Sequence, residues 1–133
     1  MQLEGIYKRT SVYQHIDYNN PKYLFTLLGD KIDSFIDSKD FSLLDVGGAS
    51  GAFCYYISKR FPQSSTTCLE YDEELCEIGK NQVPCNFICG DAENMTAIKD
   101  NTYDIVTMIG VLSIFDDFKK SISECLRVVR RGG

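Results

Sequence analysis

Short apolar runs alternate with longer amphipathic stretches along most of the chain. Four runs are rich in apolar and β-branched residues, as is typical of buried β-strands: residues 43–46, 66–69, 86–89 and 104–109. Apolar residues recur at helical spacing in residues 21–38, 51–60 and 117–129, and Asp72 can cap a further helix. This alternation predicts an α/β fold with a parallel sheet, because right-handed crossovers place helices on both faces.

The predicted helices carry apolar residues along one side, which we expect to face the sheet. In residues 21–38 the apolar positions are Leu24, Leu27, Leu28, Ile32, Phe35 and Ile36. In residues 117–129 they are Phe118, Ile122, Cys125, Leu126 and Val129. The helix at 51–60 is expected to bury Phe53, Tyr56 and Ile57.

The length and charge of the chain disfavour a membrane-spanning protein and a nucleic-acid-binding protein. The 133 residues have the length of one domain and contain no apolar run of the ~18 residues that span a bilayer. The first residues lack the pattern of a signal peptide, so we expect a cytoplasmic protein. A net charge of −5 disfavours nucleic acid as a partner, since phosphate binding needs a basic surface and only Arg127, Arg130 and Arg131 cluster.

Six cysteines are scattered along the chain without a CxxC pair. A reducing cytosol disfavours disulfides. The one short spacing, Cys85 to Cys89, has no second pair to complete a zinc site. We therefore expect free thiols and no metal centre.

The strongest chemical signal is residues 45–51, Asp-Val-Gly-Gly-Ala-Ser-Gly, between the first strand and the next helix. Glycines allow a sharp turn and close approach of a ligand, and a helix N-terminus offers N–H groups to an anion. Asp45 ends an apolar strand, so its carboxylate needs a partner such as a ligand ammonium or the loop amides. Neither the dinucleotide pattern G-x-G-x-x-G nor the P-loop fits this spacing.

This segment resembles the acidic-x-Gly-x-Gly-x-Gly motif of class I S-adenosylmethionine-dependent methyltransferases. Asp45, Gly47 and Gly51 match the motif, and Ala49 replaces its middle glycine. Further segments resemble family landmarks in the family's order: Glu70-Tyr71, Gly90-Asp91-Ala92, residues 103–106, residues 109–112 and residues 124–133.

The resemblance implies a Rossmann-like sheet of about four parallel strands in the order 3-2-1-4, with helices on both faces. It implies S-adenosylmethionine as cofactor, held by Asp45, Gly47, Gly48, Ala49, Gly51, Glu70, Tyr71, Asp91, Ala92 and Ile109. In the family, Glu70 would bind the ribose hydroxyls, Tyr71 would lie against the adenine, and Asp91 would accept from its amino group. The implied activity is methyl transfer to an O, N or C atom of an acceptor, with a small molecule favoured.

The resemblance covers roughly residues 41–133, the cofactor-binding core, and residues 1–40 are expected to cap the cofactor site. Residues 124–133 resemble a signature that precedes the fifth of seven strands, so we expect a core without its last three strands. The open edge of the fourth strand would then favour self-association. Two alternatives stay open: an inactive cofactor-binding or dimerisation scaffold, and an NAD(P)-dependent oxidoreductase.

No catalytic residue follows from the resemblance, because correct orientation of the acceptor supplies much of the rate. His15 is the one side chain with a neutral-range pKa, and it lies near Tyr7, Tyr13 and Tyr18. These residues could line the active site, but a surface histidine and packing tyrosines are the favoured interpretation.

Overall fold

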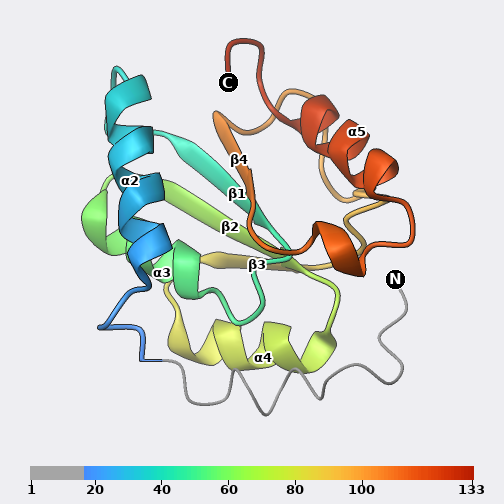
Figure 1. Ribbon diagram of the computed structural model, residues 1–133, viewed down its shortest axis with the longest axis horizontal. Helices are drawn as coiled ribbons and strands as arrows, with labels where there is room; N and C mark the ends of the chain where they lie inside the picture. Colours follow the sequence, from blue (N-terminus) through green and yellow to red (C-terminus); the bar gives the residue numbers. More distant parts are fainter. Residues whose placement is uncertain (1–16) are drawn as a thin grey trace.

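Four parallel strands form the centre of the computed structural model, which describes residues 17–133 (Figure 1). The strands are β1 (Ser42–Val46), β2 (Ser65–Glu70), β3 (Asn86–Cys89) and β4 (Ile105–Met108). They lie in the order β3-β2-β1-β4, which confirms the predicted sheet. The helices are α2 (Tyr23–Phe35), α3 (Ala52–Arg60), α4 (Glu73–Gln82) and α5 (Phe118–Val128), with the short 3₁₀ helix η1 (Leu112–Ile114) before α5.

β1 lies inside the sheet because three of its five side chains are apolar and can be buried on both faces. Leu43, Leu44 and Val46 have no exposed surface. The strand pairs with β2 on one side and β4 on the other, and Asp45 stands between Cys68 and Thr107 in this register. The last residues of β1 therefore lie beside the ends of both neighbours.

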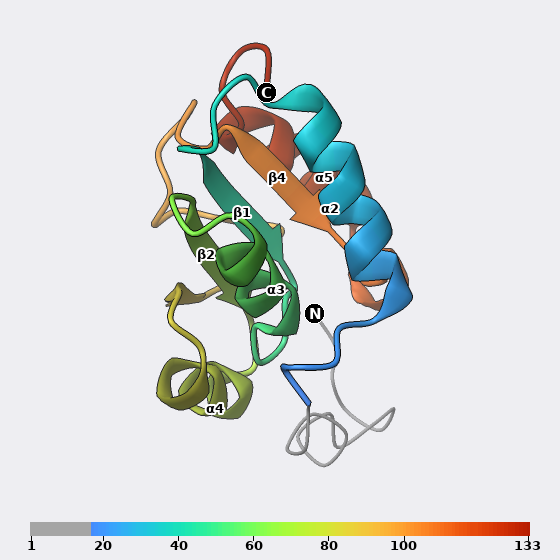
Figure 2. The same cartoon turned by 90° about the vertical axis from the view of Figure 1, so that its left-hand side faces the viewer.

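Each face of the sheet carries its own apolar cluster. On one face Leu43 packs with residues of α2 and α3, among them Phe25 and Phe53. On the other face Leu44 and Val46 pack with Val128 of α5 and with the loop that follows β3. Figure 2 shows α2 and α3 covering one face and α5 the other, so the prediction of helices on both faces is confirmed.

The apolar side predicted for the first helix is only partly correct. Ile32 is buried and Leu28 and Ile36 pack against the core, but the most buried aromatic residue of α2 is Phe25. Leu24, Leu27 and Phe35 are exposed. The helix turns toward α3 instead, because Gly29 allows close contact there: an added Cβ would lie 2.7 Å from the hydroxyl of Tyr56.

The apolar side predicted for the last helix is mostly uncovered. Ser121 and Val128 are its buried residues, whereas Leu126, Phe118 and Ile122 are exposed. Arg127 fixes this orientation, because its guanidinium donates to the carbonyls of Ile98 and Met95 as well as to carboxylates. Arg127 therefore binds α5 to the loop before β4 and is no part of a solvated basic patch.

Most element boundaries agree with the predicted ranges within three residues. Asp72 caps α4 as predicted, since its side chain accepts from the amides of Glu74 and Leu75. α3 buries Phe53 and Ile57, but Tyr56 is half-buried because its hydroxyl accepts from Arg60. The short helix η1 is an addition, since the sequence pattern predicts no helix between β4 and α5.

The six cysteines are free thiols, of which Cys54, Cys68 and Cys76 are buried. Within residues 17–133 no group of three or more His, Cys, Asp or Glu side chains is arranged to hold a metal ion. The same part of the chain contains no helix with the length and hydropathy needed to cross a membrane.

Candidate functional site

The glycine-rich turn between β1 and α3 forms the floor of the candidate site. Gly47 and Gly51 have φ values of 72° and 87°, which glycine adopts at little cost. Ala49 also has a positive φ, 54°, although it carries a side chain. The amides of Gly47 and Gly48 donate to the carbonyl of Leu69, so the turn is bonded to the end of β2.

Gly48 is required by close packing against Asp45. An added Cβ would lie 2.6 Å from Asp45 Oδ2 and 2.6 Å from Cys68 Sγ. Asp45 itself is buried, and the hydroxyl of Thr107 donates to its Oδ1 at 2.7 Å. Burial raises the pKa of Asp45 to about 7; the Thr107 hydrogen bond lowers it and the nearby charge of Glu70 raises it.

Glu70, the last residue of β2, holds the turn from the other side. Its side chain is 1% exposed. Its Oε2 accepts from the amide of Ala49 at 2.9 Å, and its Oε1 accepts from the amide of Asp72 at 3.2 Å. The carboxylate therefore connects the glycine turn to the start of α4.

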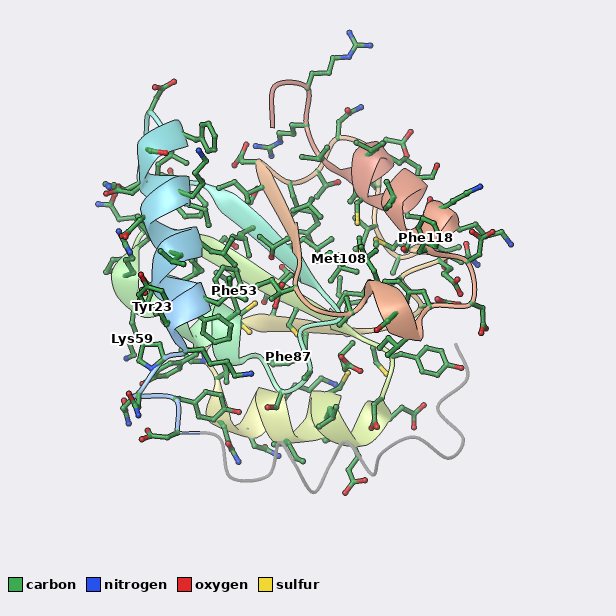
Figure 3. All side chains as sticks on the ribbon, in the orientation of Figure 1. Tyr23, Phe53, Lys59, Phe87, Met108 and Phe118 are labelled. Carbon is green, nitrogen blue, oxygen red and sulfur yellow. The ribbon has the colours of Figure 1, made fainter. Side chains whose placement is uncertain are left out.

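A cavity of about 330 Å³ opens above the glycine turn, within the size range of small-molecule sites. Five of the predicted cofactor residues line it: Asp45, Gly47, Gly48, Ala49 and Ile109. Its opposite wall comes from residues 17–25 and from Phe53 of α3, which Figure 3 labels between α2 and the sheet. The segment before α2 therefore covers the glycine turn.

A second, much smaller cavity lies on the other side of Gly47. Glu70, Tyr71 and Ala92, three more of the predicted residues, line it together with residues of η1 and its neighbour. Because Gly47 belongs to both cavities, the two lie next to each other along the carboxyl ends of β1 and β2. Eight of the ten predicted residues are thus brought to one edge of the sheet.

The other two predicted residues, Gly51 and Asp91, line neither cavity. Gly51 is required by packing, since an added Cβ would lie 2.6 Å from the ring of Phe87. The side chain of Asp91 accepts from the amide of Glu93 at 2.8 Å and so stabilises its own loop.

Sequence reasoning missed Thr107 and undervalued Tyr18. Thr107 faces Asp45 in the strand register, and a polar residue in each of two apolar strands was the available signal. Tyr18 was favoured as a packing residue, yet it lines the larger cavity, and its hydroxyl donates to the carbonyl of Ser50 at 3.2 Å. Burial raises the pKa of Tyr18.

Two further predictions concern other residues. Asp104, favoured as structural, accepts from the amide of Ser42 and pairs with Arg130 at 2.7 Å, which agrees with that role. His15, Tyr7 and Tyr13 lie outside the described residues.

A cavity of about 900 Å³ elsewhere in the described part of the chain does not contain the glycine turn. It runs beside β4 between α2 and α5, and its lining includes Phe35, Val106 and Leu126. Buried carboxylates and glycine backbone converge at the 330 Å³ cavity, which is therefore the candidate site, since volume alone carries no chemistry.

Comparison with known proteins connects this geometry to a family. The model of the methyltransferase domain family matches residues 44–133. A malonyl-[acyl-carrier protein] O-methyltransferase of Ilyobacter polytropus is 27% identical over 122 residues, which are 87% of this chain and 45% of the relative. The chain spans less than half the length of the curated relatives that it matches.

Solved structures have the same fold. The PH0226 protein of Pyrococcus horikoshii superposes with a TM-score of 0.77 at 19% identity, over 97% of this chain and 64% of that one. The plantazolicin methyltransferase BpumL, solved with S-adenosylhomocysteine, gives 0.69 at 22% identity, over 85% of this chain and 46% of that one.

Proposed function

The chain belongs to the methyltransferase domain family, and on that premise we propose that it binds S-adenosylmethionine and transfers its methyl group to an acceptor. The observation that carries the proposal is the pair of buried carboxyl groups around the glycine turn. Asp45 packs against Gly48, and Glu70 accepts from the amide of Ala49. The family match favours methyl transfer over nicotinamide chemistry, whose glycine spacing this turn lacks.

The residues present fit this cofactor. At Gly47 an added Cβ would meet Val111 at 3.0 Å, so the turn requires glycine at this position, which lines both cavities. A carboxylate such as Asp45 suits an ammonium group, and a carboxylate such as Glu70 suits ribose hydroxyls because it is acceptor-only. Gly47, Gly48, Ala49 and Ile109 would contact the remainder of the ligand, with Tyr71 and Ala92 beside the base.

Gly51 and Asp91 have different parts in this proposal. Gly51 acts through Phe87, because it allows the first turn of α3 to lie against that ring. Asp91 follows β3 by two residues, and because its Oδ1 accepts from the amide of Glu93, its Oδ2 would accept from the amino group of the base.

When bound, S-adenosylmethionine supplies an electrophilic methyl group that an O, N or C nucleophile takes in line. The chain's own contribution is to orient both partners and exclude water. We expect residues 1–40, of which the structure describes 17–40, to cap the core formed by residues 41–133. Tyr18 and Phe25, which line the cavity, would then contact the acceptor. The acceptor is a small molecule, and the chain acts in the cytoplasm, where its free thiols stay reduced.

Calorimetric titration with S-adenosylhomocysteine, with NAD as control ligand, tests the proposal. We expect binding of the first ligand alone. Asp45→Asn, which keeps the shape of the side chain, should weaken binding at pH 8 by roughly tenfold, the equivalent of one lost ionic contact. Glu73→Gln removes an exposed carboxylate from α4 and should bind like the wild type.

Each alternative has its own outcome in this experiment. A folded wild-type chain that binds neither ligand would favour the scaffold alternative. Binding of NAD would favour the oxidoreductase.

A further inference from the structure

The two carboxylate oxygens of Asp45 have different surroundings. Oδ1 accepts from the hydroxyl of Thr107 at 2.7 Å. Oδ2 lies beside the glycine turn, since an added Cβ at Gly48 would be 2.6 Å from it. The carboxylate is therefore held at one oxygen by β4, and its other oxygen borders the turn.

Oδ2 keeps contact with the cavity although Asp45 as a whole is buried. Within residues 17–133, Oδ2 accepts no hydrogen bond, whereas every fully buried side-chain oxygen and nitrogen of that part of the chain has a partner. Oδ2 is therefore not enclosed by protein. Because Asp45 and Gly48 both line the 330 Å³ cavity, this oxygen is available to a ligand there.

The position of Thr107 follows from the pairing of β4 with β1, which lie side by side in Figure 1. Thr107 stands opposite Asp45 in the register. Its hydroxyl has one proton to donate, and the carbonyl of Leu44, at 3.5 Å, is the other acceptor within reach. The bond to Asp45 is much shorter, so the proton of the hydroxyl goes to the carboxylate.

We propose that Thr107 is a positioning residue for the cofactor, because its hydroxyl occupies Oδ1 of Asp45 and leaves an ionised Oδ2 to accept from the ammonium group of S-adenosylmethionine. This inference rests on the proposed function and adds a residue that does not itself touch the ligand. It also gives the polar side chain in the apolar strand β4 a purpose.

The ionisation of Asp45 depends on all the groups that face it. Burial raises its pKa to about 7, the Thr107 hydrogen bond lowers it, and the nearby charge of Glu70 raises it. The other titratable groups around Asp45 and its cavity are Cys68 of β2, Cys54 of α3, and Asp17 and Lys22 before α2. A hydrogen bond donated to a carboxylate favours the charged form, so loss of the Thr107 hydroxyl should raise the pKa of Asp45 further.

The titration of Asp45 in the free protein tests the first half of the inference. It can be followed by the carbon NMR signal of labelled aspartate, with Asp45→Asn to assign the signal. Thr107→Val has the same shape without the hydroxyl and should raise the midpoint by about one pH unit, a tenfold change in the ionisation constant. Thr107→Ser keeps the hydroxyl and should titrate like the wild type.

Calorimetric titration with S-adenosylhomocysteine at several pH values tests the second half. At pH 7, Thr107→Val should bind roughly fivefold more weakly than the wild type, because the ionised fraction of Asp45 falls from about a half to about a tenth. The difference should narrow to about twofold at pH 8, where the variant also ionises. Thr107→Ser should bind like the wild type.

Thr67→Val is the matched control. Thr67 is a buried threonine of β2 that pairs with Leu44, so its side chain lies on the opposite face of the sheet from Asp45. Its replacement should change neither the midpoint of Asp45 nor the pH dependence of binding.

Equal midpoints for the wild type and Thr107→Val would overturn the inference. A loss of affinity of the same size at every pH would also overturn it, because a purely structural role produces that result. A folded wild type that binds no S-adenosylhomocysteine, with midpoints that still differ, would contradict the proposed function and leave the control of Asp45 by Thr107 in place.

Discussion

At the scale of single residues, Ala49 is the departure from the family motif that the structure explains. Its φ of 54° lies in the left-handed region, which costs a residue with a side chain about 1–2 kcal/mol. The turn tolerates the cost because the Ala49 amide is bonded to the buried carboxylate of Glu70. With alanine in place of the motif's glycine, the amide of residue 49 keeps its position, but the folded protein is less stable.

Replacing Ala49 by glycine should stabilise the protein. The relief of the left-handed conformation exceeds the roughly 0.5–1 kcal/mol that glycine loses through the entropy of the unfolded chain. We expect the free energy of unfolding to rise by about 0.5–1 kcal/mol in urea denaturation. Ala97→Gly is the control: Ala97 is exposed and has no positive φ, so the same change should lower stability.

Asp45 should make cofactor affinity depend on pH. Its pKa is raised to about 7, so the folded protein holds a proton that the unfolded chain, with a pKa of 3.8, releases. Stability contributed by this group therefore falls as pH rises from about 4 to 7. A ligand ammonium needs the ionised form, so affinity should rise in the same direction and level off above pH 8.

Titration of the wild type with S-adenosylhomocysteine at pH 6 and pH 8 measures this effect. The ionised fraction of a group with a pKa of about 7 rises roughly tenfold over this interval, and affinity should rise by up to that factor. Asp45→Asn should bind equally at both pH values. An affinity of the wild type that falls toward pH 8 would show that another group controls binding.

At the scale of elements, α4 packs on the sheet through a glycine. An added Cβ at Gly79 would lie 2.2 Å from the ring of Phe87 and 2.9 Å from the carbonyl of Ser50. The same ring rests against Gly51 at the start of α3, and Figure 3 labels it between the sheet and α4. One aromatic side chain thus sets the distance between two helices and the glycine turn.

Gly79→Ala should destabilise the protein although alanine is the better helix former. The gain in helix propensity is about 1 kcal/mol, but overpacking of a filled core costs about 1–3 kcal/mol, so we expect a net loss of roughly 1 kcal/mol. Phe87→Leu in the same chain should restore part of the loss. Gln82→Ala is the control, since Gln82 is exposed on the same helix and its effect should be near zero.

The sequence predicts the strands and helices and the order of the strands, but not which side of a helix faces the sheet. Strand order followed from the family resemblance, and the strands themselves were marked by apolar runs between glycine turns and caps. The side of a helix that meets the sheet was not determined, because apolar residues occur nearly all around α2 and Phe25 competes with Leu24 and Leu27. Helix α5 was placed by the hydrogen bonds of Arg127, which helical spacing does not reveal.

The sequence also predicts only part of the site. It shows carboxylates at the ends of predicted strands, and the carboxyl ends of parallel strands are where ligands bind. The contact of Thr107 with Asp45 depends on the register of β4, and that of Tyr18 with Ser50 on the path of the chain before α2. Both are long-range contacts that local pattern does not encode.

At the scale of the whole molecule, the protection of backbone amides against hydrogen exchange should decrease from the centre of the sheet to its edges. β1 is paired on both sides and its apolar residues have no exposed surface, so its amides should exchange only through global unfolding. The amides of β3, which among residues 17–133 pairs with β2 alone, should exchange faster. Hydrogen exchange followed by mass spectrometry measures both, and equal protection of β1 and β3 would contradict this gradient.

The order of the strands also has a consequence for synthesis on the ribosome. β2 follows β1 closely, but the partner on the other side of β1 arrives late: Ser42 and Asp104, which are hydrogen-bonded, are 62 positions apart. At about 5–20 residues per second, roughly 3–12 s pass between translation of the two. Throughout that interval one edge of the deeply buried strand β1 lacks its partner, so we expect residues 42–46 to be open to a chaperone in the nascent chain.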